Sequence, residues 1–508
     1  MRTISSIKNI IISVALGALV IIVNFATQKF FINYLGVELL GLNGLFTNII
    51  TMLSVAELGF ESAVVYHMYK PLHENKKSEI SSLMHFYKIS YRVIAVIIAT
   101  SALILIPFIP TIAGNPDIPS NIYIIYGLFV TNSVVSYLLS YKRSILYADQ
   151  KSYIVNIIRM SSLILFNIFK ITALITTKNY YIFLILTILM TLAENIVISW
   201  VVNKKYQLDT KPKQLSKKVK KDIFKKIQGL LFHKIGSFAV KGTDNIIISM
   251  TLGLGTLGLY TNYQLIQSAL QSMFGQIASA IRASIGNLLV DIGGEKSYKT
   301  FLRLQLANQI LAIISISVFF VASDSLISVW LGKKYILDLW VLIALSISLY
   351  TFLIRLVFGN FKEAAGIFYE DRFVPIMESV INITTSFLLV NIIGLAGVFI
   401  GTAISSLSLH CYSYPKYVYK GVFHRSYREY TSHILGNFFI AIISIVPAFY
   451  ISRAVVLSNS WAQLMYDVAI AIIIPLLIVW SIYRKSDEYR YFKKLFAKLF
   501  KKLLKRHA

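Results

Sequence analysis

The feature that most constrains this chain is a series of long apolar segments. A window of about 20 apolar residues can span a bilayer as an α-helix. The sequence contains fourteen such windows, at 10–34, 43–66, 88–110, 121–141, 152–176, 180–202, 227–252, 257–290, 303–323, 336–360, 373–391, 395–415, 432–452 and 462–483. Only 14% of the 508 residues are charged, against about 25% in soluble domains. We therefore predict an all-α polytopic membrane protein with about 14 transmembrane helices.

Three details refine this prediction. The continuous apolar runs exclude a membrane β-barrel, whose strands alternate. The first window lacks a cleavage site and exceeds the core of a signal peptide, so we expect it to remain as helix one. The eighth window, 257–290, is long enough to suggest a broken or strongly tilted helix.

The basic residues predict the orientation. Of 50 Lys and Arg, 39 fall in the N-terminus and every second loop, four in the opposite loops and seven inside helices. The positive-inside rule then places both termini in the cytoplasm. The net charge of +27 is explained by this topology and by attraction to anionic lipid, and requires no nucleic acid. A single cysteine, Cys411, allows neither an intramolecular disulfide nor a cysteine metal cluster.

An internal repeat predicts the domain organisation. The stretch "LGVELLGL" from Leu35 matches "LGLGTLGL" from Leu252 at an offset of 217 residues, each between the first two helices of a half. We interpret 1–203 and 227–416 as related six-helix bundles, a plan that in transporters places the substrate between the halves. Because six is even, both halves have the same orientation and are related by an axis along the membrane normal.

Two basic segments flank the second bundle and its two additional helices at 417–483. Residues 204–226 carry ten basic residues and two acids, which indicates a cytoplasmic linker with an amphipathic segment on the membrane surface. The tail, 484–508, places phenylalanines and leucines on one helical face and lysines on the other. Both segments are predicted to contact anionic lipids, and a calmodulin-type target is the alternative interpretation of the tail.

Ionisable residues inside the spans are candidate functional residues, because each costs about 2.5–3.5 kcal/mol to insert. At helical spacing, Ser54, Glu57 and Glu61 share one face of helix two. A polar stripe on helix seven contains Lys234, Ser237, Lys241, Asp244 and Asn245. We expect both stripes to line one water-filled space. The alternative is that these charges only hold helices together through salt bridges.

The charges inside the helices also suggest a ligand. Lys234, Lys241, Arg282 and Arg355 are predicted to bind an anionic headgroup that enters from the cytoplasm, since Arg and Lys recognise phosphate. Asn245 is assigned to the same substrate site. Glu57, Glu61, Asp244 and Glu378 are assigned to ion coupling or gating, with H⁺ or Na⁺ as the ion. Lys29 and Lys170 lie near external helix ends, where snorkelling to the interface is expected.

The sequence contains no catalytic motif that competes with transport. It has no GxxxxGK[ST] nucleotide loop, no HExxH and no long external loop for an acceptor. We therefore expect no cofactor and no metal, and expect work to come from an ion gradient, the membrane potential or the substrate's own gradient.

Several phrases resemble a known family. They are "LGVELLGLNGLFTNIITMLSVAELGFESAVVYHMYKPL", "YADQKSYI", "GTDNIIISMTLGLGTLGLYTNYQLI" and "FYEDRFVPIMESVINI…GLAGVFIGTAIS". These resemble the polysaccharide transporter (repeat-unit flippase) family of the multidrug/oligosaccharidyl-lipid/polysaccharide (MOP) exporter superfamily. The match spans nearly the whole chain in order.

The resemblance implies a V-shaped, two-lobed bundle that alternates access in the bacterial cytoplasmic membrane. It implies transfer of an undecaprenyl-pyrophosphate-linked oligosaccharide to the outer leaflet, for capsule, exopolysaccharide, O-antigen or teichoic acid assembly, with a glycan polymerase or assembly machinery as partner. By motif, Glu57 lies in "AELG", Asp244 and Asn245 in "TDN", Arg372 in "DR", and Glu378 in the segment that follows. Glu61 departs from the family pattern, which has a small residue there.

Two other functions remain as alternatives. A cation-coupled multidrug exporter of the same superfamily would need a lumen of acidic character, which the four inner basic residues oppose. A membrane glycosyl polymerase or ligase would be an enzyme, and the short external loops oppose it.

Overall fold

The protein is described here from a computed structural model covering residues 2–57, 60–116, 118, 120–209, 212, 214–291, 294–367 and 370–494. Within helices, some side chains fall outside this description, those of residues 228–241 among them. The chain forms two compact units, Met1–Thr261 (unit 1) and Asn262–Ala508 (unit 2). Their boundary falls within a helix, and the division into two six-helix bundles stays a prediction.

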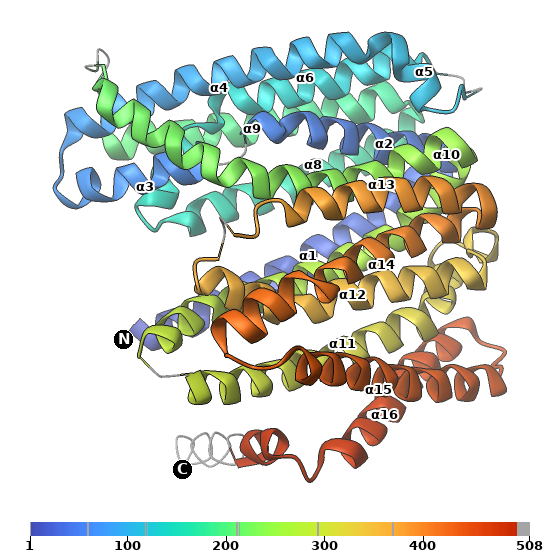
Figure 1. Ribbon diagram of the computed structural model, residues 1–508. Helices are drawn as coiled ribbons and strands as arrows, with labels where there is room; N and C mark the ends of the chain where they lie inside the picture. The colour runs from blue at the N-terminus through green and yellow to red at the C-terminus, as the bar shows by residue number, and fades with distance from the viewer. Residues whose placement is uncertain are drawn as a thin grey trace, which may run out of the picture. The chain divides into compact units, whose positions relative to one another are not determined.

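Every regular element of the described residues is helical (Figure 1). Unit 1 contains α1 (Arg2–Leu35), α2 (Val37–Leu53), the 3₁₀ turn η1 (Ser54–Glu57), α3 (Phe60–His73), α4 (Lys77–Leu105), η2 (Ile106–Phe108), α5 (Ile109–Ile112), α6 (Ile122–Ser140), α7 (Arg143–Ala148), α8 (Ser152–Thr177), α9 (Tyr180–Tyr206) and the first part of α10 (Lys217–Asp291). Unit 2 contains the rest of α10, α11 (Gly294–Trp330), η3 (Lys333–Tyr335), α12 (Leu339–Ala364), α13 (Val374–Ile393), α14 (Leu395–Cys411), the π-helix η4 (Tyr414–Val422), α15 (Tyr427–Ala454) and α16 (Ser460–Tyr483).

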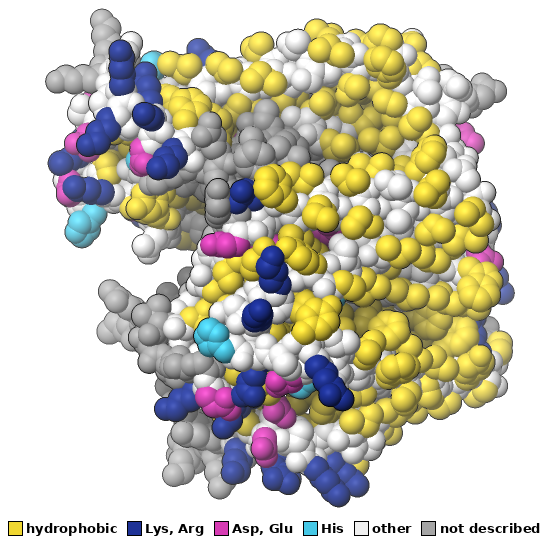
Figure 2. Space-filling view, viewed as in Figure 1, with side chains coloured by type: hydrophobic (Ala, Val, Ile, Leu, Met, Phe, Trp, Pro, Cys, Tyr) yellow, Lys and Arg dark blue, Asp and Glu magenta, His cyan; other side chains and the backbone are white. Residues whose placement is uncertain are grey.

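The predicted membrane class is confirmed. Among the described residues, ten helices are long and apolar enough to cross a membrane, and two shorter apolar helices, Leu19–Leu35 and Val37–Leu53, precede them. In each unit the charged side chains gather toward one end, while hydrophobic side chains cover the flank (Figure 2). Among the described spans, five begin at a side chain that accepts a backbone N–H bond of the first turn and so caps the helix, namely those after Asn121, Asn179, Asp338, Ser426 and Asn459.

The internal repeat has a direct counterpart in the backbone. Gly36, between α1 and α2, has φ 90° and ψ 172°, and its repeat partner Gly253 has φ 81° and ψ 168°. Such a left-handed φ is readily adopted only by glycine. The turn at Gly253 divides α10 into two helical arms. Residues 257–290 form one continuous helix after this turn, so the eighth window is not broken, and its strong tilt, the other expectation, stays a prediction.

The two copies of the repeat also pack against each other within unit 1. A Cβ atom added to Gly41 would lie 2.1 Å from the carbonyl oxygen of Leu254. A Cβ atom added to the repeat partner of Gly41, Gly258, would lie 2.0 Å from the carbonyl oxygen of Val37. Val37 and Leu254 are themselves repeat partners, so the contact is reciprocal. Both positions require glycine because the facing backbone fills the space of a side chain.

Two predictions about helices are corrected. The window 43–66 is not one helix, because α2 ends at Leu53, η1 follows and α3 begins at Phe60. The single helical face predicted for Ser54, Glu57 and Glu61 is therefore interrupted. The apolar face of the linker is buried in protein instead of lying on lipid, since Ile223 and Ile227 belong to the core of unit 1 with α3 and α4. Of the predicted amphipathic tail, 484–508, residues 495–508 lie outside the described residues.

Candidate functional site

Glu57 lies at the interruption between α2 and α3, among tyrosines of α4. The hydroxyl of Tyr91 donates to Oε1 of Glu57, and the hydroxyl of Tyr87 donates to that of Tyr91 over 2.5 Å. Both tyrosines are almost fully buried, and the ring of Tyr137 packs against that of Tyr91 in a tilted arrangement. Of the described ion pairs, none includes Glu57. The carboxylate is thus held by neutral hydroxyl groups, partners that the sequence analysis did not consider.

The other predicted polar positions of unit 1 lie on or beside α10. Glu61 occupies the first turn of α3 and is half-buried. Asp244 and Asn245 are buried, and both amide atoms of Asn245 lack a hydrogen-bond partner. The amide of Asn245 lies 3.8 Å from the position of a Cβ built on Gly44 of α2. A buried, unpaired amide is costly and calls for an explanation such as a bound ion or polar ligand.

The structure brings α2, part of predicted helix two, into direct contact with both arms of α10, which correspond to predicted helices seven and eight. Met52 of α2 packs on Gly242 in the first arm of α10, and Gly44 faces Thr261 in the second. The side chains of Lys234 and Lys241 lie outside the described residues, so their predicted role in headgroup binding stays a prediction.

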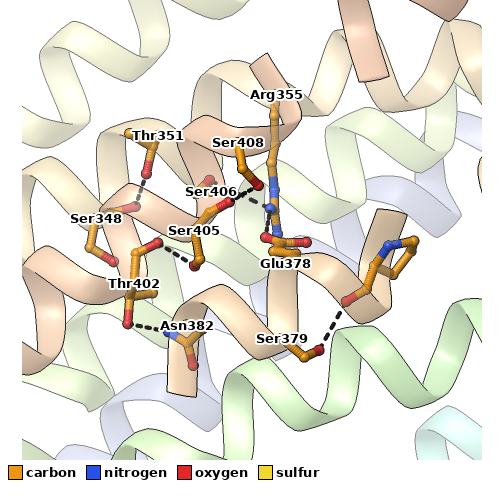
Figure 3. A network of polar contacts seen from close by, with 11 residues as sticks. Ser348, Thr351, Arg355, Glu378, Ser379, Asn382, Thr402, Ser405, Ser406 and Ser408 are labelled. Atoms are coloured by element: carbon orange, nitrogen blue, oxygen red, sulfur yellow. Dashed lines mark hydrogen bonds and ion pairs between the residues drawn. The ribbon is translucent and has the colours of Figure 1, made fainter. Parts of the chain in front are cut away.

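Unit 2 contains a buried ion pair within its membrane-spanning helices. Nη1 of Arg355, on α12, donates to Oε1 of Glu378, on α13, over 2.6 Å. Glu378 is 6% exposed. Ser406 of α14 lies 3.5 Å from the same nitrogen, and the guanidinium covers the ring of Phe352. Three helices thus meet at one charge pair (Figure 3).

Hydroxyl and amide side chains continue from this pair along the three helices. Figure 3 shows Ser348 and Thr351 on α12, Ser379 and Asn382 on α13, and Thr402, Ser405, Ser406 and Ser408 on α14. Asn382 donates to the hydroxyl of Thr402 over 3.0 Å, which joins α13 to α14. We call this group, with Arg355 and Glu378, the polar seam.

Arg282 lies at a more open position. Its Nη1 is 2.8 Å from Oε2 of Glu363, and its Nε donates to the amide oxygen of Asn360 over 3.2 Å. The Arg282 side chain is 48% exposed. Both arginines that were assigned to the substrate are therefore matched by a carboxylate in this conformation. The substrate and coupling roles of these residues stay predictions.

Several charged residues that matter to the structure were missed or misread. Asp371 is fully buried and binds Lys362 and Ser413, so it ties α12 to the segment before η4.

Lys170 does not snorkel as predicted. It is 7% exposed and its ammonium lies 5.0 Å from the ring centre of Phe183. Its proximity to a helix end suggested the interface, but packing of α9 over α8 encloses it.

Two aspartates lie close together between α11, α15 and α16. Asp467 is 2% exposed and accepts hydrogen bonds from Ser325, Ser452 and Gln463. Asp324 pairs with Arg453 at 2.9 Å. The sequence places both aspartates in apolar surroundings, a signal that could have identified them. Among the described residues no group of His, Cys, Asp and Glu is suited to hold a metal ion.

The motif "YADQKSYI" forms the turn between α7 and α8. Asp149 accepts a hydrogen bond from Tyr206 at the end of α9 over 2.5 Å, and another from Lys151. Partial burial of Asp149 raises its pKa, but these hydrogen bonds outweigh it and the pKa is lowered overall. The motif thus fixes the end of α9 through Asp149.

These helices, with charges held inside their spans, define a multi-pass α-helical membrane protein. The family described as "Polysaccharide biosynthesis protein" matches residues 6–282, more than half of the chain. The chain belongs to this family.

Solved structures identify the fold as that of the MOP superfamily. A structure titled "Lipid II flippase MurJ, inward closed conformation" is similar with a TM-score of 0.65 and 15% identity, covering 93% of this chain and 99% of its own. An inward-facing MATE family multidrug resistance transporter of the MOP superfamily has a TM-score of 0.58 and 15% identity, covering 76% and 91%. No curated protein matches the chain.

Proposed function

We propose that this protein is a flippase for undecaprenyl-pyrophosphate-linked oligosaccharide repeat units. It would carry them from the cytoplasmic to the outer leaflet of a bacterial cytoplasmic membrane by alternating access, with both termini cytoplasmic. The observation that carries the proposal is the polar seam of unit 2. A charged headgroup cannot cross hydrocarbon unaided, and the seam offers an arginine, hydroxyls and amides within the membrane-spanning helices. The family and the fold shared with a lipid II flippase support the same conclusion.

The ion pair suggests how a diphosphate is accepted and released. Arg355 is neutralised by Glu378 in the absence of substrate, so neither charge is buried alone. An arriving pyrophosphate would compete for the guanidinium, because Arg binds phosphate oxygens through charge-assisted hydrogen bonds. Glu378 would then take up H⁺ or Na⁺, which links headgroup binding to an ion gradient. Asn245, with its unpaired amide, would contact the polar headgroup or the ion.

Glu57 would serve as a second titrating group. Its bond to Tyr91, which in turn accepts from Tyr87, forms a short chain of hydroxyl groups that ends at a carboxylate. Such a chain can hold or pass a proton. Asp244 and Glu61 are assigned with Glu57 to coupling or gating, and Lys234, Lys241 and Arg282 to the headgroup. Anionic lipids at the basic linker and tail, and a glycan polymerase or assembly machinery, complete the proposed partners.

A cation-coupled multidrug exporter remains the second candidate. The observation that favours it is the fold, which is shared with a MATE family transporter. Such an exporter would use acidic side chains for a cationic drug, whereas Glu378 is matched here by Arg355.

Reconstitution separates the two functions. The purified chain in proteoliposomes should move an undecaprenyl-pyrophosphate-linked oligosaccharide between leaflets, measured as glycan that becomes accessible to an external glycosidase. Deletion of the gene should cause lipid-linked glycan to accumulate on the inner leaflet. Drug sensitivity with normal surface glycan, and no glycan transfer in vesicles, would instead support the exporter.

A further inference from the structure

A pocket in unit 1 is not used by the proposed transport pathway. It encloses about 810 Å³, a size typical of small-molecule sites. Its walls come from the end of α3, the start of α4 and the segment that leads into α10. Figure 2 shows charged side chains gathered at this end of unit 1. The sequence predicts this end to be cytoplasmic.

The linker forms the third wall of the pocket and is held in place by its contacts with α3. Nε2 of His67 lies 2.9 Å from Oδ2 of Asp222, and Nδ1 of His67 lies 2.7 Å from the carbonyl oxygen of Ala63. Both neighbours of the ring are hydrogen-bond acceptors, so the ring joins α3 to the linker. Ile223 and Ile227, directly after Asp222, are buried in the core of unit 1. The pocket is therefore built by tertiary contacts between segments about 150 residues apart in the chain.

The lining of the pocket combines exposed rings with hydrogen-bonding groups. Tyr66 and Tyr69 are 60% and 50% exposed, although each is on a helix beside the core. Ser78, Gln214 and Ser216 supply hydroxyl and amide groups. An aromatic ring with a polar edge, beside neutral donors and acceptors, suits a ligand that has one apolar face and many hydroxyls.

The charges of the pocket favour a neutral ligand over an anion. The described lining contains one lysine, Lys70, and two carboxylates, those of Glu79 and Asp222. A phosphate site would need uncompensated cations. A sugar ring needs none, since its hydroxyls bind carboxylates and amides, and its C–H face packs on an aromatic ring.

We propose that this pocket binds, before transport, a sugar of the oligosaccharide beyond the one attached to the pyrophosphate, as a subsite separate from the headgroup site. The inference rests on the proposed function, which supplies a glycan at this end of the protein. Tyr66 and Tyr69 pack against the sugar ring, and the groups around Ser78 and Gln214 bind its hydroxyls. The subsite selects the glycan part of the substrate, while the polar seam acts on the pyrophosphate.

Binding can be tested without transport. The full chain in detergent, fluorescently labelled, is applied to an array of neutral and acidic bacterial oligosaccharides, with inorganic pyrophosphate as competitor. We expect retention on particular oligosaccharides, about tenfold weaker for Tyr66→Ala/Tyr69→Ala, a loss equivalent to about 1.4 kcal/mol. Tyr153→Ala is the matched control, because this residue is also an exposed tyrosine, 54% exposed, outside the pocket. Retention that is equal in the double variant, absent in the wild type or displaced by pyrophosphate would overturn the proposal.

Transport separates failure of the subsite from failure of the flippase. In proteoliposomes, Tyr66→Ala/Tyr69→Ala should lower transfer of the full lipid-linked oligosaccharide about tenfold and leave that of a lipid-linked monosaccharide close to wild type. An equal loss with both lipids, or no loss with either, counts against the subsite. A wild-type protein that transfers neither lipid, yet binds oligosaccharides through the two tyrosines, counts against the flippase only.

Discussion

The two copies of the internal repeat begin with the same backbone turn and then differ in chemistry. Gly36 and Gly253 both turn the chain with a positive φ. The first copy then carries Glu57 and Glu61, while the second has Phe274 and Ala278 at the corresponding positions, both buried.

The secondary structure differs at the same place. The first copy leaves α-helical geometry at Ser54 and resumes it at Phe60, where the carboxylates lie. The second copy continues as helix through Phe274. Both copies therefore keep the close helix packing at their glycines, Gly41 and Gly258. Only the first copy places titratable side chains at an interruption of the helix. Unit 2 carries buried carboxylates elsewhere, among them Glu378 on α13, which pairs with an arginine.

The largest effect on stability is expected at the buried ion pair of unit 2, between Arg355 and Glu378. Arg355→Ala leaves the carboxylate of Glu378 buried without a cation, which should lower the free energy of unfolding by about 3–5 kcal/mol. Denaturant titration of the purified protein in detergent measures it. Arg355→Met/Glu378→Leu should recover most of the loss. A double variant no more stable than Arg355→Ala would show that the pair is not coupled.

The close contact between the two copies of the repeat is tested by adding one methyl group at each glycine. Gly41→Ala and Gly258→Ala should each cost about 1–3 kcal/mol, because a Cβ atom would lie 2.0–2.1 Å from a facing carbonyl oxygen and the helices must separate. Thermal unfolding measures the change. Gly255→Ala is the control, since its nearest neighbour, Cγ of Glu38, is 4.0 Å away. If all three variants have the same thermal stability, the packing of the two copies does not depend on close approach of their backbones.

The chemistry peculiar to the first copy is tested at Tyr91. Tyr91→Phe removes the hydroxyl that donates to Glu57 and accepts from Tyr87 and should cost about 1–3 kcal/mol, because the buried hydroxyl of Tyr87 and the partly buried carboxylate each lose a partner. Tyr91→Phe/Glu57→Met makes the site apolar, as in the second copy, and should restore much of this stability while changing the pH dependence of transport. Unaltered pH dependence in the double variant would remove Glu57 from coupling.

The smallest effect is expected at the open ion pair of unit 2. Arg282→Ala should change the free energy of unfolding by about 0–1 kcal/mol, since exposed pairs contribute little and this side chain is 48% exposed. Its effect on glycan transfer should be larger than on stability if Arg282 contacts the headgroup. A stability loss comparable to that of Arg355→Ala would contradict the distinction between the two pairs.

Much of the fold was predictable because its signals are local. Long apolar windows must form helices across a bilayer, since lipid offers backbone groups no other partner. The paired glycines of the repeat also predicted equivalent turns. The break at Ser54–Glu57 was missed because apolar content continues through it, and hydropathy does not reveal backbone geometry.

The sequence by itself determined the membrane class, the repeat and which ionisable residues lie within spans, because these follow from composition and period. The tertiary structure alone decided the partners. Glu57 meets Tyr91, Glu378 meets Arg355, Lys170 is enclosed against Phe183, and the linker docks on α3 and α4. The physical reason is that a buried polar group takes whichever partner an adjacent helix presents, and helix adjacency depends on packing between segments distant in the chain.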